Sequence, residues 1–290
     1  MFDVRPARDL GNATMNPFRI LAAPWHAGSR KPATPDPATA APDTNSADRI
    51  VRVREGSTEV AYCTPNRATR WRVETLFTKE PDTIEWIRGF QPGDVLVDVG
   101  ANVGMYSIWA AKTRGARVFA FEPESQNFAL LNRNIAANQL GNQVTAYCLA
   151  ISDAACYSVL HVSSLAVGVS AHMLAEDLDH NLQPRKSPHQ QGCVAATLDE
   201  LVGSGAIPVP THLKVDVDGL EHKVVAGVRK TLADSRLKSI LIEINDVLAE
   251  HRMIVEELRA SGFRYSEEQV RAARRATSES SGIGNYVFRR

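Results

Sequence analysis

The chain has 290 residues, of which 33 are Lys or Arg and 33 are Asp or Glu, so its formal net charge is zero. Nucleic-acid-binding proteins usually carry a basic surplus, so this balance disfavours a nucleic-acid partner. A composition of 44% hydrophobic and 23% charged residues excludes a wholly disordered chain and is typical of a globular protein with a sizeable core.

The four cysteines form neither a C-x-x-C pair nor a zinc-ligand spacing, which predicts a reduced, cytoplasmic compartment. The N-terminal apolar stretch, residues 20–25, is too short for a signal peptide. Residues 154–175 contain no Asp, Glu, Lys or Arg and are long enough to cross a membrane. They also contain two histidines, a glycine and four serines, so we predict strands and loops and no membrane span.

In chain order, residues 31–48 come first, with four prolines and no aromatic residue, Val, Ile or Leu. Such a segment cannot bury enough apolar surface to fold, so we predict a disordered or weakly ordered arm and linker over residues 1–48. Residues 50–62 alternate in hydrophobicity around a Glu-Gly pair, which predicts a hairpin. Helical spacing follows, so residues 49–93 are predicted to form a hairpin and helical cap.

From residue 94 to residue 290, short apolar runs alternate with helical patterns. The predicted strands are 95–99, 117–121, 144–151, 212–217, 239–244, 263–265 and 285–288, and the predicted helices are 103–112, 124–138, 220–232 and 247–260. This alternation predicts an α/β fold with a mostly parallel sheet and helices on both faces. Ligands of such sheets bind at the carboxyl ends of the strands.

A glycine-containing loop, Asp98-Val-Gly-Ala-Asn-Val-Gly104, follows the first of these strands. A dinucleotide-binding loop would have a glycine where Asn102 stands and a third glycine at Met105, so the loop favours a nucleoside without a pyrophosphate. Glu122 ends the second strand, 22 positions after Gly100, where an acid can accept hydrogen bonds from ribose hydroxyls. An NAD-dependent oxidoreductase is the disfavoured alternative.

These motifs resemble the FkbM family of S-adenosylmethionine-dependent methyltransferases. The blocks that carry the resemblance are VLVDVGANVGMYS (95–107), FAFEPESQNFALLNRN (119–134), LAISD (149–153), TLDEL (197–201) and HLKVDVDGLE (212–221). The resemblance implies a Rossmann-like class I methyltransferase fold with a seven-stranded sheet whose last strand is antiparallel. It also implies methylation of a hydroxyl on a sugar, a polysaccharide precursor or a natural product.

The resemblance further assigns cofactor contacts to individual residues. Besides Asp98 at the start of the loop, the residues implied are Gly100, Asn102 and Gly104 for the methionine portion, Glu122 for the ribose, and Ser152 and Asp153 for the adenine edge. Methyl transfer would then be an in-line displacement by an acceptor oxygen. The alternative from another class is a nucleoside-binding module without catalysis, acting in polysaccharide assembly.

A second candidate site ends the strand at 212–217. Asp216 and Asp218 lie two residues apart and therefore on one face, where one carboxylate could serve as a base or both could hold a cation. Lys214 shares their face and could neutralise one of them. For Asp218 the alternative is to cap the next helix. His222, in the first turn of that helix, is a further catalytic candidate, with a surface position as its alternative.

Three other features are weaker. Oxygen ligands from Asp216, Glu243 and Asn245 could hold a divalent metal, but their spacing does not establish a site, so no metal ligand is assigned. His172 could act as a base, although a solvated loop position is favoured. The tryptophans that could stack on a sugar are Trp71, Trp86 and Trp109, with a core position favoured for Trp109. The sequence does not identify the acceptor or the oligomeric state.

Overall fold

The computed structural model describes residues 49–273 and 282–290, so the predicted arm at residues 1–48 lies outside the described residues. The described chain opens with an antiparallel hairpin of β1 (Arg49–Glu55) and β2 (Thr58–Thr64), as predicted. Helices α1 (Arg67–Glu74) and α2 (Pro81–Arg88) follow. The Asn66 side chain caps α1 by accepting a hydrogen bond from the Thr69 amide, and the ring of Pro81 suits the first turn of α2. The division into arm, cap and catalytic domain stays a prediction.

The central sheet holds six strands within the described residues, in the order β12-β11-β10-β3-β4-β5. Their bounds are β3 (Val95–Val99), β4 (Arg117–Phe121), β5 (Val144–Tyr147), β10 (His212–Val215), β11 (Ser239–Asn245) and β12 (Ile283–Arg289). The first five are parallel and β12 is antiparallel to β11. The predicted mostly parallel sheet with an antiparallel last strand is thereby confirmed.

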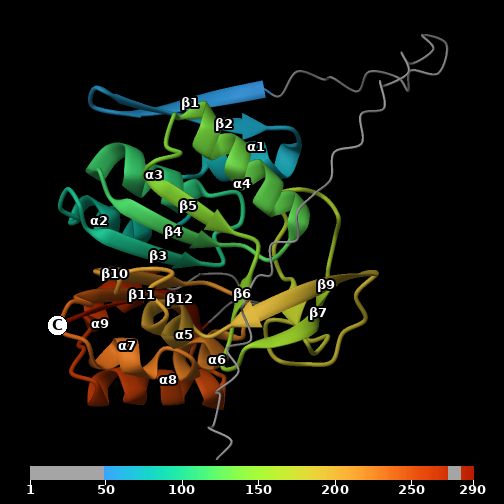
Figure 1. Ribbon diagram of the computed structural model, residues 1–290, viewed down its shortest axis with the longest axis vertical. Coiled ribbons are helices and arrows are strands. Elements are labelled where there is room, and N and C mark those ends of the chain that lie inside the picture. Colours follow the sequence, from blue (N-terminus) through green and yellow to red (C-terminus); the bar gives the residue numbers. More distant parts are fainter. Residues whose placement is uncertain (1–48, 274–281) are drawn as a thin grey trace, which may run out of the picture. The chain divides into compact units, whose positions relative to one another are not determined.

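Helices cover both faces of this sheet, because successive strand residues point to opposite faces. Leu96 and Val118 belong to a core with α2, α3 and α4, whereas Val97 and Phe119 belong to a core with α6, α7 and α8. In Figure 1, α3 and α4 lie above the sheet and α7 and α8 lie below it. The helix bounds are α3 (Met105–Arg114), α4 (Ser125–Ala137), α5 (Leu198–Gly203), α6 (Glu221–Ala226), α7 (Arg229–Ala233), α8 (Ala249–Ala260) and α9 (Glu267–Ala273).

Three predicted elements differ in the structure. The seventh strand, at 263–265, is reduced to one bridge between Arg264 and Arg289, because α8 ends just before it and α9 begins just after. The predicted helix at 220–232 is broken into α6 and α7 at Gly227, where an added Cβ would lie 2.1 Å from the Ser152 carbonyl oxygen. The predicted strand at 144–151 divides, because residues 144–147 pair with β4 and Ala150 pairs with Ala195 in another sheet.

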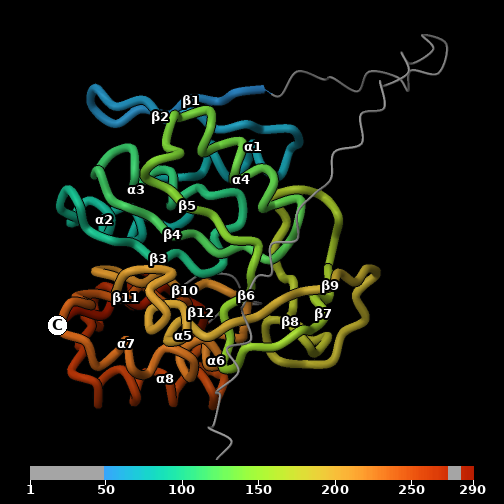
Figure 2. The backbone as a smooth tube through the Cα atoms, viewed as in Figure 1, coloured from blue at the N-terminus to red at the C-terminus, as the bar shows by residue number. Residues whose placement is uncertain are grey.

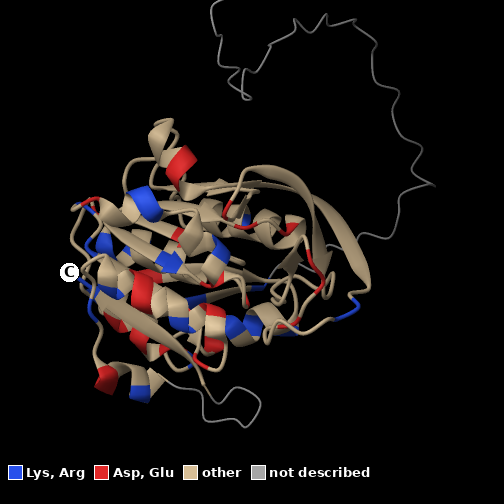
Figure 3. Cartoon of the chain, turned by 90° about the horizontal axis from the view of Figure 1, so that it is seen from below, with Lys and Arg blue, Asp and Glu red and all other residues tan. Residues whose placement is uncertain are grey.

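That other sheet consists, among the described residues, of β6 (Ala150–Ile151), β9 (His189–Ala196), β7 (Cys156–Val162) and β8 (Met173–Leu174), in that spatial order. Figure 2 shows it beside the end of the central sheet to which β3, β4 and β5 run. The charge-free stretch at 154–175 forms β7, a loop and β8. Within the described ranges, no helix is long and apolar enough to cross a membrane. Basic and acidic residues are interspersed in the view of Figure 3.

Candidate active site

A cleft lies at the carboxyl ends of β3, β4, β10 and β11. It consists of three adjoining hollows, all lined by Gly100, within the part of the chain that the structure describes. The middle hollow has a volume of about 290 Å³. Of the residues that the sequence assigns to cofactor binding or catalysis, those that line the cleft are Gly100, Asn102, Glu122, Ser152, Asp216 and Asp218. The weaker candidates Trp71, His172, Lys214 and Glu243 line it as well.

Gly100 brings the loop after β3 against the end of β10. Its φ is +78°, and an added Cβ would lie 1.8 Å from the Asp216 carbonyl oxygen, so no other residue fits this backbone. Gly104 has a different role, because a Cβ added there would lie 2.3 Å from Cδ1 of Leu131, on α4. Asp98 lies beneath the cleft and accepts a 2.6 Å hydrogen bond from the Ser107 hydroxyl. Gly104 and Asp98 therefore support the loop and do not line the cleft.

Glu122 lies buried at the end of β4. One carboxylate oxygen accepts from the Asn102 amide at 2.8 Å and the other from the Glu124 amide at 2.9 Å. Burial raises the pKa of Glu122 to about 8, although both backbone amides oppose the shift. Each carboxylate oxygen has a second lone pair, which can accept a hydroxyl proton from a ligand in the cleft.

One end of the cleft is mostly apolar. Its walls are the side chains of Phe121, Leu149, Ile151, Leu174 and Leu220, with Ser152 at the edge. The Ser152 hydroxyl donates to Asp153 at 3.0 Å, while Asp153 itself is exposed and does not line the hollow. An apolar slot with one polar edge, next to a buried acid, fits a purine attached to a ribose.

Asp216 and Asp218 both line the middle hollow, but they differ in their partners. The Lys214 ammonium lies 3.2 Å from Asp216 and 3.5 Å from Asp98, with only 2% of its side chain exposed. Burial alone would lower the pKa of Lys214, but these carboxylates raise it. Asp216 is therefore held beside a fixed positive charge, although β10 ends at Val215 and not at residue 217 as predicted.

Asp218 has a left-handed backbone, with a φ of +58°. Its carboxylate accepts a 2.7 Å hydrogen bond from the Ala171 amide of the loop before β8. The capping alternative for Asp218 is wrong, because Leu220 is the N-cap of α6 and no side chain caps that helix. Burial, and then the charge of Asp216, raises the pKa of Asp218 to about 6.

Of the two candidate histidines, His172 lines the cleft and His222 does not. His222 faces His251, with ring centroids 6.2 Å apart, and is not among the residues that line the cleft. His172 lines both the middle and the apolar hollow. Its Nδ1 accepts from the Ser163 amide at 3.2 Å, and its buried Nε2 has no hydrogen-bond partner among the described residues. Burial lowers the pKa of His172, so the ring is neutral near pH 7.

Carboxylate oxygens of Asp216, Glu221 and Glu243 lie within 4.8 Å of one another. Glu221 accepts from the Val217 amide at 2.8 Å and from the Gly219 amide at 3.0 Å, with one of these bonds on each carboxylate oxygen. The Asn245 amide nitrogen donates to Asn181 at 3.2 Å, and its amide oxygen accepts from the Val247 amide at 3.3 Å.

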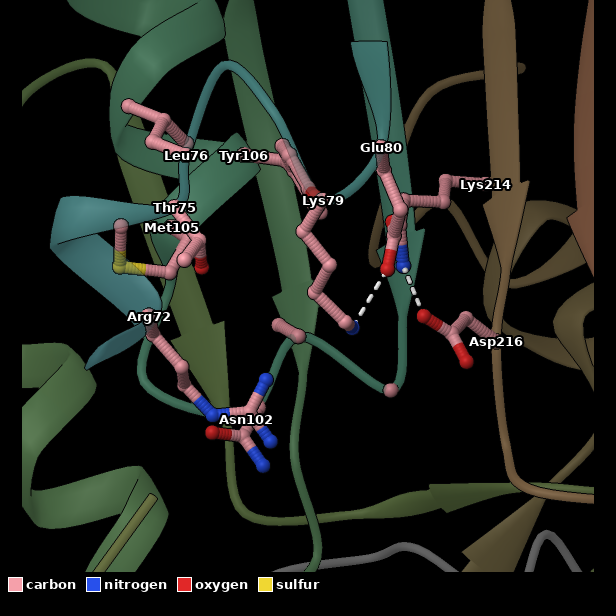
Figure 4. A pocket seen from close by; sticks show the side chains of 12 residues that line it. Arg72, Thr75, Leu76, Lys79, Glu80, Asn102, Met105, Tyr106, Lys214 and Asp216 are labelled. Carbon is pink, nitrogen blue, oxygen red and sulfur yellow. Dashed lines mark hydrogen bonds and ion pairs between the residues drawn. The ribbon is translucent and has the colours of Figure 1, made fainter. Parts of the chain in front are cut away.

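The residues at the other end of the cleft were not predicted from the sequence. There the lining includes Arg72, Lys79 and Glu80, which come from α1 and from the turn before α2. Figure 4 shows Lys79 turned towards Glu80 and Arg72 beside Asn102. These residues belong to no recognisable motif, and only the packing of α1 against the sheet brings them here.

Comparison with known proteins gives a consistent result. Residues 98–265, more than half of the chain, match the model of the methyltransferase FkbM domain. The chain is 30% identical over 199 residues to the 31-O-demethyl-FK506 methyltransferase FkbM of Streptomyces tacrolimicus, covering 62% of this chain and 76% of that protein. It is 28% identical over 176 residues to the hexuronic acid methyltransferase AglP of Haloferax volcanii, covering 60% of this chain and 66% of AglP.

Among solved structures, the chain is similar to a precorrin-6y C5,15-methyltransferase from Geobacter metallireducens. The identity is 16%, the TM-score is 0.41, and the alignment covers 72% of this chain and 86% of that one.

Proposed function

The chain belongs to the FkbM methyltransferase family, and we propose that it transfers the methyl group of S-adenosylmethionine to a hydroxyl oxygen of a sugar, a polysaccharide precursor or a natural product. The two alternatives, an NAD-dependent oxidoreductase and a non-catalytic module, are not favoured by this membership. The observation that carries the proposal is the cleft, which joins an apolar slot, a buried acid at a strand end and a pair of aspartates around Gly100.

The residues of the cleft fit the cofactor. Ser152 and the apolar walls would hold the adenine, Glu122 would accept from the ribose hydroxyls, and Gly100 and Asn102 would face the methionine portion. When bound, S-adenosylmethionine supplies a methyl carbon that its positively charged sulfur makes electrophilic. Acidic side chains outnumber the basic ones, Arg72 and Lys79, in the lining of the middle hollow, which favours a cation there. The acids beside the methyl position would be Asp216, Asp218 and Glu243.

Asp218 is the better candidate for the base that takes the acceptor's proton. A base works best when its pKa lies near the working pH, and burial brings the pKa of Asp218 to about 6. Asp216 is paired with Lys214 at 3.2 Å, so its carboxylate serves better to orient ligands. His172, with Nδ1 occupied by the Ser163 amide, carries its proton on Nε2 and would donate to a ligand oxygen.

The acceptor would enter beside α1. The Trp71 side chain is 49% exposed and lines the middle hollow, together with Ser170 from the opposite loop. An exposed indole face next to hydroxyl and carboxylate groups suits a ring that bears hydroxyls. A cytoplasmic location, which the cysteine usage predicts, and the absence of a nucleic-acid partner both stay predictions.

Transfer of labelled methyl from S-adenosylmethionine to a panel of sugars, lipid-linked sugars and hydroxylated natural products tests the function. With an acceptor in hand, Asp218→Asn should lower kcat about 10²- to 10⁴-fold, the usual contribution of a general base. The affinity for S-adenosylhomocysteine should stay nearly unchanged. Wild-type kcat should decline as the pH falls through about 6, because Asp218 then takes up a proton.

The matched comparison is Asp216→Asn. If this variant lost turnover while Asp218→Asn kept it, the assignment of the base would be wrong. If no acceptor in a broad panel were labelled although the protein bound S-adenosylhomocysteine, the non-catalytic alternative would regain support.

A further inference from the structure

The charged end of the cleft is built from two distant parts of the chain. Asn102, Lys214 and Asp216 come from the segment that matches the family model, residues 98–265. Arg72, Lys79 and Glu80 line the same hollow but precede that segment. The hollow shares Arg72, Lys79, Gly100, Asn102 and Asp216 with the middle of the cleft, but it shares only Gly100 with the apolar slot.

The Glu80 side chain lines this hollow and does not cap α2, the helix that it precedes. It occupies the N-cap of α2, yet its carboxylate accepts no capping bond from the backbone of that helix. Instead the carboxylate lies 2.5 Å from the Lys79 ammonium and has only 6% of its side chain exposed. Burial alone would raise the pKa of Glu80, but Lys79 and Lys214 outweigh it and lower that pKa, so Glu80 stays ionised.

The hollow has as many positive as negative side chains, and these lie at different places around it. The cations are Arg72, Lys79 and Lys214, and the anions are Glu80, Asp216 and the underlying Asp98. Figure 4 shows two ion pairs side by side, Lys79 with Glu80 and Lys214 with Asp216. A simple anion or a simple cation would place a like charge next to one member of these half-buried pairs, which is unfavourable. A ligand group with one charge of each sign can exchange partners with such pairs.

We propose that this hollow binds the α-amino acid end of S-adenosylmethionine, with Glu80 and Asp216 beside the ammonium and Lys79 and Arg72 beside the carboxylate. The inference rests on the methyl donor named in the proposed function and goes beyond it, since the family-matched segment alone would not complete the cofactor site. The order along the cleft supports it: the apolar slot suits adenine, Glu122 suits ribose, and the charged hollow comes next.

Two ligands that differ in this end test the proposal by calorimetry. S-adenosylhomocysteine carries the amino acid, whereas 5′-methylthioadenosine has the same nucleoside without it. In Glu80→Gln, the Kd of S-adenosylhomocysteine should rise about 10- to 100-fold, as expected for the loss of a charged hydrogen bond. The Kd of 5′-methylthioadenosine should change less than about twofold. The control Glu85→Gln, on α2 with 73% of its side chain exposed, should leave both values as in wild type.

The possible results distinguish an error in the role of Glu80 from an error in the methyl donor. If Glu80→Gln weakened both ligands equally, Glu80 would be a structural residue and the proposal would be overturned. It would also be overturned if neither ligand were weakened in Glu80→Gln or in Lys79→Met. If the wild-type protein bound neither ligand, the methyl donor itself would be misassigned, and the proposed function would fall together with this inference.

Discussion

Clusters of titratable side chains lie at both ends of the strands β3, β10 and β11. The two clusters differ in whether their side chains bond to one another or face a cleft. At the amino ends, Ser239 lies 2.7 Å from His212 Nδ1, and His212 Nε2 lies 2.9 Å from Asp94. The Trp86 indole donates to Ser239 at 2.7 Å, and Phe90 stacks on the His212 ring. At the carboxyl ends, Lys214 and Asp216 face a cleft.

The two clusters show that residue types alone do not identify a ligand-binding or catalytic site in this fold. Ser239, His212 and Asp94 have the residue types and contacts of a nucleophile, a base and an orienting acid. However, the Ser239 hydroxyl is also occupied by Trp86, and the exposed fraction of Ser239 is 2%. The cluster joins α2 to the sheet. Polar groups at the carboxyl ends have room for a ligand, whereas those at the amino ends satisfy one another.

The largest expected effect lies at the carboxyl end. Gly100→Ala places a Cβ 1.8 Å from the Asp216 carbonyl oxygen at a φ of +78°. Strain and overpacking should together cost about 4 kcal/mol of folding free energy, measured by urea unfolding. Any folded fraction should lose binding of S-adenosylhomocysteine. Gly141→Ala is the control, since nothing lies within 4 Å of its added Cβ. Normal affinity in Gly100→Ala would show that the loop does not set the cleft.

At the amino end the effect should be on stability alone. Ser239→Ala leaves the Trp86 indole and the His212 Nδ1 buried without this partner, at a cost of about 2 kcal/mol in urea unfolding. The Kd of S-adenosylhomocysteine should stay within about twofold of wild type. A variant that kept its stability but lost affinity would reverse the roles assigned to the two ends.

Much of this contrast could be predicted from sequence, because it depends on local rules. A glycine after a buried strand, an acid at the end of the next strand and two aspartates in phase predict which edge of the sheet binds the ligand. Gly100, Glu122, Asp216 and Asp218 accordingly line the cleft. Lys214 also reaches the Asp216 carboxylate, as predicted, although β10 ends at Val215 and Asp216 therefore lies just beyond the strand.

The rest depends on contacts between residues far apart in the chain, for which no periodicity exists. Arg72 donates through Nε to the Gly168 carbonyl at 2.6 Å, and Asn66 donates to the Val167 carbonyl at 2.8 Å. These bonds connect α1 to the loop that carries His172 to the cleft. His222 shows the converse, since its place in a first helical turn suggested a site, but its ring lies near His251 and does not line the cleft.

The last effect is one of pH; it is the smallest when counted per pH unit, at no more than about 1.4 kcal/mol, and its sign should be opposite at the two ends. Glu122 has a pKa raised by burial from 4.5 to about 8, so between these values the folded chain binds a proton that the unfolded chain lacks. Stability from this group therefore rises as the pH falls from about 8. Burial lowers the pKa of His212 below 6.5, although Asp94 opposes the shift. Its contribution is full above pH 6.5 and is lost as the pH falls further.

Urea unfolding of wild type, Glu122→Gln and His212→Gln between pH 4.5 and pH 8 resolves the two contributions. A single proton changes stability by up to about 1.4 kcal/mol per pH unit. Glu122→Gln should remove the gain in stability between pH 8 and pH 6, above the range in which the raised pKa of Asp218 adds a gain of the same sign. His212→Gln should remove the loss that opposes these gains below pH 6.5. Because the first group faces the cleft, S-adenosylhomocysteine should alter only the Glu122 contribution. If it altered the His212 contribution as well, the amino-end cluster would be coupled to the cleft rather than a separate structural connection.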